Sequence, residues 1–517
     1  MLADARALPD RSQIDTDICV VGAGPAGITV ARELNDDAFR VCIVESGGTG
    51  PEASAQALSR LVFDDSELRP DPRERRRQFA GNAHLWRIGR RPMRSLVRYV
   101  PLDDVDFTAR AWMPHSGWPF SRSALDPYYA RAHAAAGLGA FTYDVPDRSE
   151  PLPLDDGQVR NSVEWFGTGR PFTRDALDAF RRSASITVLT HATATALQET
   201  RDGARIERLC VGCSSGRQHV VTAKVFVLAA GGIENPRLLL LSNERSPVGV
   251  GNVHDVVGRY FMDHLHVLGT LVPSDRALFA RAGLYDVRSL PDGRVMGCKL
   301  ALMPEIMERE RLMNSALKLD ARVSSQPSRG FTSTYARLVA KHRQLRPAHF
   351  GWSELASPAR RFREFATHLQ IELAPVASNR VTLSKERDML GQPLPSVHWR
   401  WDELSRRSAL GAARFLSASF AAGGLGRLEM PDDDPPALPN ALGLNHHMGG
   451  TRIHTDPRQG VVDADCRVHG VSNLYIAGSS VFPTGGYANP TLTIVALAIR
   501  LADHIREAMQ HSRAQLG

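Results

Sequence analysis

The sequence predicts a mixed α/β protein, and three patterns along its 517 residues indicate this fold class. Residues 17 to 46 read as strand, turn, helix and strand. The middle of the chain holds several runs in which apolar and polar residues alternate, as they do in half-buried strands. The stretch 489 to 510, "NPTLTIVALAIRLADHIREAMQ", has the apolar spacing of a long helix.

The first unit, from 17 to 46, predicts a strand–helix–strand crossover. "DICVVG", 17 to 22, is a short apolar run ending in glycine, and "RVCIVES", 40 to 46, is a second one. Between them "PAGITVARELND" places Ala26, Val30, Ala31 and Leu34 on one helical face. Two buried strands joined by a helix form a βαβ unit with parallel strands.

Three glycines at this strand-to-helix turn predict a dinucleotide site. Gly22, Gly24 and Gly27 form the pattern GxGxxG. The first allows the tight turn, the second lets backbone N–H groups approach a pyrophosphate, and the third lets the helix pack on the sheet. Glu45 ends the next strand, where a carboxylate accepts ribose hydroxyls and disfavours the 2′-phosphate of NADP. The alternative is a glycine turn without a ligand.

The position of these patterns favours FAD over NAD. The glycine motif lies near the chain start, and a second strand–glycine pattern, "NLYIAGSSVFPT", occupies 473 to 484. We therefore expect a Rossmann-like FAD-binding domain built from discontinuous segments. In the last block, Asn489 followed by Pro490 predicts a helix N-cap with proline at the first helical position.

The middle of the chain predicts further strands and helices. "ITVLTHATATALQET", 186 to 200, alternates like one strand, and 217 to 242 reads as strand, turn, strand, glycine turn and a short helix over Leu238 to Leu241. "THLQIELAPV" and "NRVTLSKE" indicate strands between 262 and 430, and 403 to 424 indicates a helix that ends at Gly423 and Gly424. The proline-rich stretch 430 to 440 predicts a loop or domain boundary.

Composition narrows the class of protein. No apolar run approaches the roughly 20 residues that span a bilayer, and the N-terminus has no apolar signal region, so we expect a cytoplasmic protein without membrane or nucleic-acid partners. Six cysteines are too few for a disulfide scaffold, and the single CxxC pair at Cys210 and Cys213 predicts no metal site. The arginine-rich stretch 73 to 94 is interrupted by the packing residues Phe79, Leu85, Trp86 and Ile88, which favours a solvated face or contacts to an anionic cofactor.

The chain resembles the glucose–methanol–choline (GMC) flavin oxidoreductases nearly end to end. Beside the N-terminal block, the matching stretches are "GWPFSRSALDPYYARA" (117 to 132), "GGIENPRLLLLS" (231 to 242), "VGRYFMDH" (257 to 264) and the C-terminal block 460 to 505. The stretch at 117 to 132 is similar to the bacterial branch that acts mostly on sugars and sugar-like alcohols. The resemblance thus implies an FAD-dependent enzyme that oxidises an alcohol group, and O₂ or another oxidant as the acceptor.

One family motif departs from the usual pattern. The segment "FAGNAHLW" has Ala80 where relatives have a glycine, and the position of covalent FAD attachment in some relatives falls on Leu85, next to His84. The resemblance therefore implies noncovalent FAD. Together with the glycine motif it implies these cofactor-binding residues: Gly22, Gly24, Ala26, Gly27, Glu45, Ser46, Gly81, Asn82, His84, Thr193, Ala230, Gly231, Asn235, Gly478, Ser479, Asn489, Pro490 and Thr491.

The stretch "LNHHMGGTRI", 444 to 453, holds the histidine motif that supplies the family's base. Aligning on Gly450 and Thr451 selects His447, whereas aligning on Gly449, Arg452 and Ile453 selects His446. We favour His446 because that register satisfies three anchors. The resemblance makes Asn489 its catalytic partner, and it leaves His264 and His447 as residues that line the substrate site.

The resemblance also implies a domain order. We expect FAD-binding segments at 1–115, 166–261 and 441–517, a lid or substrate-domain segment at 116–165, and a substrate domain with an antiparallel sheet at 262–440. The substrate would be a sugar, a polyol or a glycosylated natural product. A lyase of the same fold that keeps FAD, and a nonenzymatic FAD-binding module, remain as alternatives.

Overall fold

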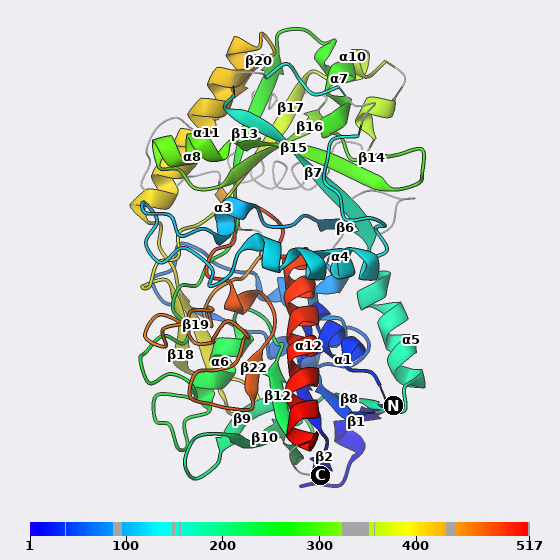
Figure 1. Cartoon of the computed structure of the whole chain (residues 1–517), viewed down its shortest axis with the longest axis vertical. Helices are drawn as coiled ribbons and strands as arrows, with labels where there is room; N and C mark the ends of the chain where they lie inside the picture. The colour runs from blue at the N-terminus through cyan, green and yellow to red at the C-terminus, as the bar shows by residue number, and fades with distance from the viewer. Residues whose placement is uncertain are drawn as a thin grey trace.

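A computed structural model describes residues 1–36, 38–85, 96–146, 150–154, 157–322, 351–355, 357–430, 441–443 and 445–514. The expected loop at 431–440 and the expected packing of Trp86 and Ile88 lie outside these residues. Figure 1 shows β-sheet structure at both ends of the long axis, and both chain termini lie at the lower end.

The lower end is built on a six-stranded parallel sheet with the order β1-β8-β4-β3-β12-β22. Its central strands are buried on both faces, which explains their continuous runs of apolar residues. The Rossmann-like prediction is therefore confirmed. The strands are β1 (Leu2–Asp4), β3 (Ile18–Val21), β4 (Val41–Val44), β8 (Ile186–Thr190), β12 (Val225–Leu228) and β22 (Leu474–Ile476).

Two element boundaries differ from the prediction. The run 186–200 is not one strand, because the chain turns at His191 (φ +54°) and continues as β9 (Thr193–Glu199) in a different sheet. The helix expected at Leu238 begins one turn earlier, as α6 (Glu234–Leu241), since Asn235 and Pro236 fit its first turn. Alternation alone cannot locate a turn that a left-handed histidine makes.

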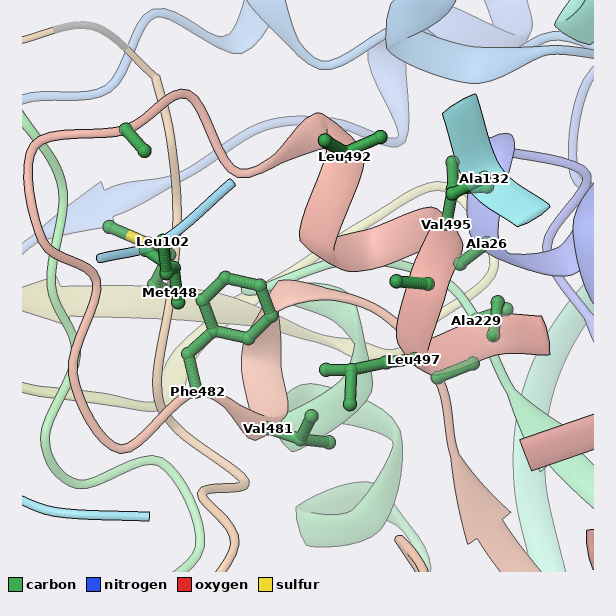
Figure 2. Packing of buried hydrophobic residues seen from close by; sticks show 14 of the residues in the cluster. Ala26, Leu102, Ala132, Ala229, Met448, Val481, Phe482, Leu492, Val495 and Leu497 are labelled. Atoms are coloured by element: carbon green, nitrogen blue, oxygen red, sulfur yellow. The ribbon is translucent and has the colours of Figure 1, made fainter. Parts of the chain in front are cut away.

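A long C-terminal helix, α12 (Thr491–Ala514), lies in front of the parallel sheet in Figure 1 and packs against α1 (Pro25–Glu33) and α4 (Asp126–Ala135). Figure 2 shows that Val495 of α12 lies beside the small residues Ala26 and Ala132. The small side chains let the helices approach closely. The other α-helices among the described residues are α2 (Ala53–Ala57), α3 (Asp104–Phe107), α5 (Arg174–Arg182), α7 (Leu278–Arg281), α8 (Pro304–Glu310), α10 (Pro358–Arg361) and α11 (Glu403–Ala422).

The upper end holds a nine-stranded sheet in which the strands pair antiparallel. It confirms the expected antiparallel sheet, although β6 comes from within segment 1–115 and β7 crosses residue 165. The strands are β6 (Leu96–Tyr99), β7 (Val159–Thr168), β13 (Leu265–Pro273), β14 (Arg288–Ser289), β15 (Val295–Leu302), β16 (Ser315–Arg322), β17 (Glu364–Ile371), β20 (Gly426–Glu429) and β21 (Ala441–Gly443).

The two faces of this sheet differ in polarity. Side chains alternate along a strand, and paired residues share a face. The pairs His266↔Gln370 and Lys318↔His368 therefore lie on one polar face. The neighbouring positions, such as Leu317 paired with Leu369, carry buried apolar residues on the other face.

Two smaller sheets complete the structure. One has the order β2-β11-β10-β9, with β2 (Gln13–Asp15), β10 (Ile206–Gly212) and β11 (Gln218–Thr222). The other has the order β18-β19-β5, with β5 (Val62–Phe63), β18 (Arg380–Arg387) and β19 (Pro393–His398). Among the described residues, no helix combines the length and apolarity that crossing a bilayer requires.

Candidate active site

A cavity of about 260 Å³ lies where the parallel strands β3, β4, β12 and β22 end. The carboxyl ends of parallel strands are the usual ligand site of such a sheet. Most residues predicted to bind the cofactor line this cavity: Gly22, Gly24, Ala26, Glu45, Ser46, Gly81, Asn82, Thr193, Ala230, Gly231, Gly478, Ser479, Pro490 and Thr491.

The glycine turn leaves room for a ligand at the start of α1. Gly22 adopts φ +103°, and a Cβ there would lie 2.7 Å from the carbonyl oxygen of Ala229. At Gly24 a Cβ would meet no protein atom within 4 Å, so this position opens onto the cavity. The first N–H groups of a helix have no partner within the helix. A pyrophosphate fits this position, because it can accept from those groups.

Glu45 presents a buried carboxylate to the same cavity. Its Oε2 accepts a hydrogen bond from the backbone N–H of Ala23 (2.9 Å), and its Oε1 accepts one from Gly47 (2.8 Å). Burial raises the pKa of this carboxyl, against the opposing effect of those two hydrogen bonds. Each carboxylate oxygen has a second lone pair, so Glu45 can still accept the ribose hydroxyls of FAD.

Four residues predicted to bind the cofactor are not part of the cavity wall, and one of them, Asn489, bonds to His446 instead. Gly27 lies against the turn, where a Cβ would be 2.0 Å from the Gly22 carbonyl oxygen. Asn235 is fully buried and joins two loops, because its Oδ1 accepts from Ala230 N–H (2.8 Å) and its Nδ2 donates to Ser480 Oγ (2.9 Å). His84 donates through Nε2 to the carbonyl of Phe79 (2.9 Å). These three residues shape the wall from behind.

Three consecutive arginines line the cavity and were not predicted individually. Arg75 and Arg77 both form ion pairs with Glu234, the first residue of α6, and Arg76 lies between them in the chain. Burial raises the pKa of Glu234, but the neighbouring arginines lower it by more than burial raises it. The net pKa is below its usual value, so the carboxylate stays ionised. In the sequence, only the arginine-rich stretch 73 to 94 pointed to these residues. Of its two interpretations, contacts to an anionic cofactor fit this location.

The histidine motif brings together the residues predicted to be catalytic. Nε2 of His446 lies 3.1 Å from Nδ2 of Asn489, and Nδ1 of His446 lies 3.0 Å from Nδ1 of His264. Burial, followed by the nearby His264 and Arg98, holds the pKa of His446 well below its usual value. The His446 ring is therefore neutral at neutral pH and keeps a lone pair for a proton.

His447 has different neighbours from His446. Its ring lies 5.7 Å from that of Phe261, and its Nε2 has no hydrogen-bond partner among the described residues. Burial lowers the pKa of His447 to about 3. Both histidines line the cavity, but Asn489 bonds to His446.

Two expectations about neighbouring residues change. Asn489 is not the N-cap of α12, because this helix begins at Thr491 and the N–H of Ile494 bonds to the carbonyl of Pro490. The Asn489 side chain is used instead by His446 and by Arg98, whose Nη1 donates to its Oδ1 (3.3 Å). His264, expected to line the substrate site, is fully buried behind His446 and is not part of the cavity wall.

Comparison with known protein families identifies two matching regions. Residues 17–296 match the FAD dependent oxidoreductase family, and residues 375–498 match the C-terminal region of the GMC oxidoreductases. Among solved structures, a formate oxidase has a TM-score of 0.58 with 18% sequence identity, covering 98% of this chain and all of that one.

Several curated relatives are also similar to this chain. The large subunit of fructose dehydrogenase from Gluconobacter japonicus is 34% identical over 56% of this chain and 48% of its own length. The 2-methyl-1,2-propanediol dehydrogenase from Mycolicibacterium austroafricanum is 27% identical over 95% of both chains. The 6'''-hydroxyparomomycin C oxidase from Streptomyces lividus is 28% identical over 62% of this chain and 51% of its own length. With the two family matches and the cavity at the glycine turn, these relatives show that the chain belongs to the GMC family of FAD-dependent oxidoreductases.

Proposed function

We propose that this enzyme oxidises a CH–OH group to a carbonyl, with His446 as the base and Asn489 as the group that holds the substrate oxygen. The observation that carries the proposal is the 3.1 Å approach of Asn489 Nδ2 to His446 Nε2. An alcohol placed at this pair can donate its O–H to the ring nitrogen and accept from the amide. The same pair thus orients the alcohol and removes its proton.

The redox part of the reaction belongs to the cofactor. When bound, FAD supplies the acceptor for the hydride and its two electrons. His446 takes the hydroxyl proton, so the C–H and O–H bonds that break account for both hydrogens that the alcohol loses when it becomes a carbonyl. Gly24, Glu45 and the N-terminus of α1 would hold the cofactor's dinucleotide part. We propose noncovalent binding, because Leu85 stands at the attachment position of some relatives and the neighbouring His84 uses its Nε2 for a backbone carbonyl.

A sugar, polyol or glycosylated substrate is the second part of the proposal. The names of the relatives support it, since they refer to fructose, 2-methyl-1,2-propanediol and 6'''-hydroxyparomomycin C. The polar face of the nine-stranded sheet supports it as well. Lys318 Nζ pairs with Asp320 (2.8 Å), and His368 lies 3.5 Å from the same carboxylate. These half-buried groups can bond to hydroxyls of a polar substrate.

The alternatives receive less support. The relatives described above are named dehydrogenases and oxidases, which does not favour a lyase or a nonenzymatic FAD-binding module.

The cysteines of the chain are free thiols, which agrees with a reducing, cytoplasmic setting. We keep the five-segment domain order as part of the proposal. The electron acceptor is O₂ or another oxidant.

The proposal is tested by mixing the purified holoenzyme anaerobically with a panel of sugars, polyols and simple alcohols. We expect the flavin absorbance to bleach with at least one polar member of the panel and the product to contain a carbonyl. Admitting air then separates an oxidase, which recovers its absorbance quickly, from a dehydrogenase. Turnover of a substrate without any bleaching would instead indicate a lyase.

A further inference from the structure

Glu164 holds two cations close to the catalytic pair. It lies on β7 and is 2% exposed. Its Oε2 is 2.9 Å from Nε of Arg98 on β6, and its Oε1 is 2.8 Å from Nζ of Lys299 on β15. Burial raises the pKa of Glu164, but Arg98 and Lys299 lower it more, so the carboxylate stays ionised. Buried charges are stable only when paired, so each of the three depends on the others.

The first connection runs from Lys299 to His446. Nζ of Lys299 donates to Oε1 of Gln370 (2.8 Å). An ammonium group cannot accept a hydrogen bond, so the oxygen of the Gln370 amide must face Lys299. The Nε2 of Gln370 then faces Nδ1 of His264 at 3.3 Å and can only donate to it. The Nδ1 of His264 is therefore an acceptor.

This acceptor decides the protonation of the neighbouring histidine. His446 Nδ1 lies 3.0 Å from His264 Nδ1, so His446 must be the donor of that contact. Burial lowers the pKa of His264 to about 4, so its ring is neutral and carries a single proton. Because Nδ1 of this neutral ring accepts, the proton lies on Nε2 of His264, which has no hydrogen-bond partner among the described residues. With its own proton on Nδ1, His446 keeps an unprotonated Nε2.

The second connection reaches the same nitrogen independently. Nη1 of Arg98 donates to Oδ1 of Asn489 (3.3 Å), and a guanidinium cannot accept. The amide nitrogen of Asn489 must therefore face Nε2 of His446, at 3.1 Å, and donate to it. Both connections give one answer: Nε2 of His446 is an acceptor, and Asn489 presents an N–H beside it.

We propose that Glu164, Arg98, Lys299 and Gln370 are positioning residues that fix the tautomer of His446 and the orientation of the Asn489 amide. This inference rests on the proposed roles of His446 and Asn489. Lys299 and Arg98 fix the two amides because neither cation can accept a hydrogen bond. If the amide of Gln370 or Asn489 rotated, its NH₂ group would face the cation and that hydrogen bond would be lost. The base nitrogen is thereby set before the substrate arrives, which lowers the cost of reaching the reactive arrangement.

The sharpest variant is Gln370→Glu, which keeps the shape but removes the donor. A carboxylate accepts from Lys299 and also accepts from His264, so the proton of His264 moves to Nδ1. His446 must then accept at Nδ1 and carry its proton on Nε2, where it cannot act as the base. We expect anaerobic flavin reduction to slow by roughly 10², near the lower limit for loss of a positioned base, while the substrate concentration at half-saturation changes little.

Two variants at Lys299 give a matched comparison. Lys299→Arg keeps a group that only donates, so it should retain most of the rate. Lys299→Met lets the Gln370 amide rotate and should slow reduction. A control, Gln218→Glu, introduces the same charge on exposed β11 and should leave the rate unchanged. Equal rates for Lys299→Arg and Lys299→Met would overturn the inference.

A spectroscopic measurement tests the tautomer without any variant at the positioning residues. In ¹⁵N-histidine-labelled holoenzyme, the His446 signals are identified by their loss in His446→Gln. We expect shifts of an Nδ1-protonated ring at neutral pH, and shifts of an Nε2-protonated ring would refute the inference. If His446→Ala reduces flavin at the wild-type rate, the proposed function fails. If His446→Ala is slow but Gln370→Glu is not, only the positioning inference fails.

Discussion

His446 and His447 are adjacent in the sequence, but only one of them is placed to act as the base. Asn489 contacts His446, whereas His447 packs beside Phe261. We expect His446→Ala to lower anaerobic flavin reduction by about 10² to 10⁴, and His447→Ala to cost far less. Stopped-flow absorbance measures both, with flavin content as the check on folding. The reverse ranking would assign the base to His447.

Glu45 allows a second test on single residues. Glu45→Gln removes a charge and one acceptor from the cavity but keeps the size of the side chain. Hydrogen bonds to charged groups contribute about 1.5 to 3 kcal/mol, so we expect FAD affinity to fall roughly 10- to 100-fold, measured by fluorescence titration of the apoprotein. Asp17→Asn is the matched control, because Asp17 precedes β3 at the opposite edge of the sheet and pairs with Lys224. An unchanged affinity in Glu45→Gln would mean that another group holds the ribose.

The sequence predicts some of these residues and not others, for a physical reason. Gly22, Gly24 and Glu45 lie within one βαβ unit, so short-range spacing places them together. Arg98, Glu164 and Lys299 come from strands far apart in the sequence and meet only through the pairing of β6, β7 and β15. No spacing rule connects them, because the register of a sheet is set by long-range packing.

At the level of elements, two glycines at the junction of β3 with α1 have different roles: Gly27 allows packing and Gly24 leaves room for the cofactor. A Cβ at Gly27 would lie 2.0 Å from a backbone carbonyl, whereas one at Gly24 would meet no protein atom within 4 Å. Gly27→Ala should therefore destabilise the fold by about 1 to 3 kcal/mol or more, since α1 must move off the sheet. Gly24→Ala should leave the stability of the apoprotein nearly unchanged and weaken FAD binding. Thermal melts and FAD titrations of both variants measure the contrast; a similar loss of stability in both would contradict it.

The element boundaries show what a pattern can and cannot locate. Buried strands and the long helices α11 and α12 were predicted well because their apolar spacing is sustained. The break between β8 and β9 and the start of α12 were missed. Each depends on one local feature, the left-handed His191 and a Pro490 that precedes the helix rather than opening it. An Asn-Pro pair fits a helix cap in the sequence, and only the structure shows its amide bonded to His446 and Arg98.

For the whole molecule, buried and half-buried histidines make the stability depend on pH. Burial lowers the pKa of His264 and of His368 to about 4, and that of His447 to about 3. In the unfolded chain a histidine has a pKa of about 6.5. Between these values the unfolded chain binds protons that the folded chain does not, so stability falls as the pH decreases from 6.5 towards 4. Buried Asp286 acts in the opposite sense, because burial raises its pKa to about 7.

His368 tests this balance away from the FAD cavity. Each fully shifted histidine changes the free energy of unfolding by at most about 1.4 kcal/mol per pH unit. His368→Gln cannot take up a proton in either state, so the decline in stability between pH 6.5 and 4 should become shallower by up to that amount. Urea unfolding with saturating FAD at several pH values measures the slope, which keeps cofactor loss from mimicking the effect. His254→Gln, on an exposed loop, is the control and should reproduce the wild-type slope. If both variants decline as steeply as the wild type, His368 titrates in the folded chain, and its burial on the polar face of the sheet does not carry the acid sensitivity.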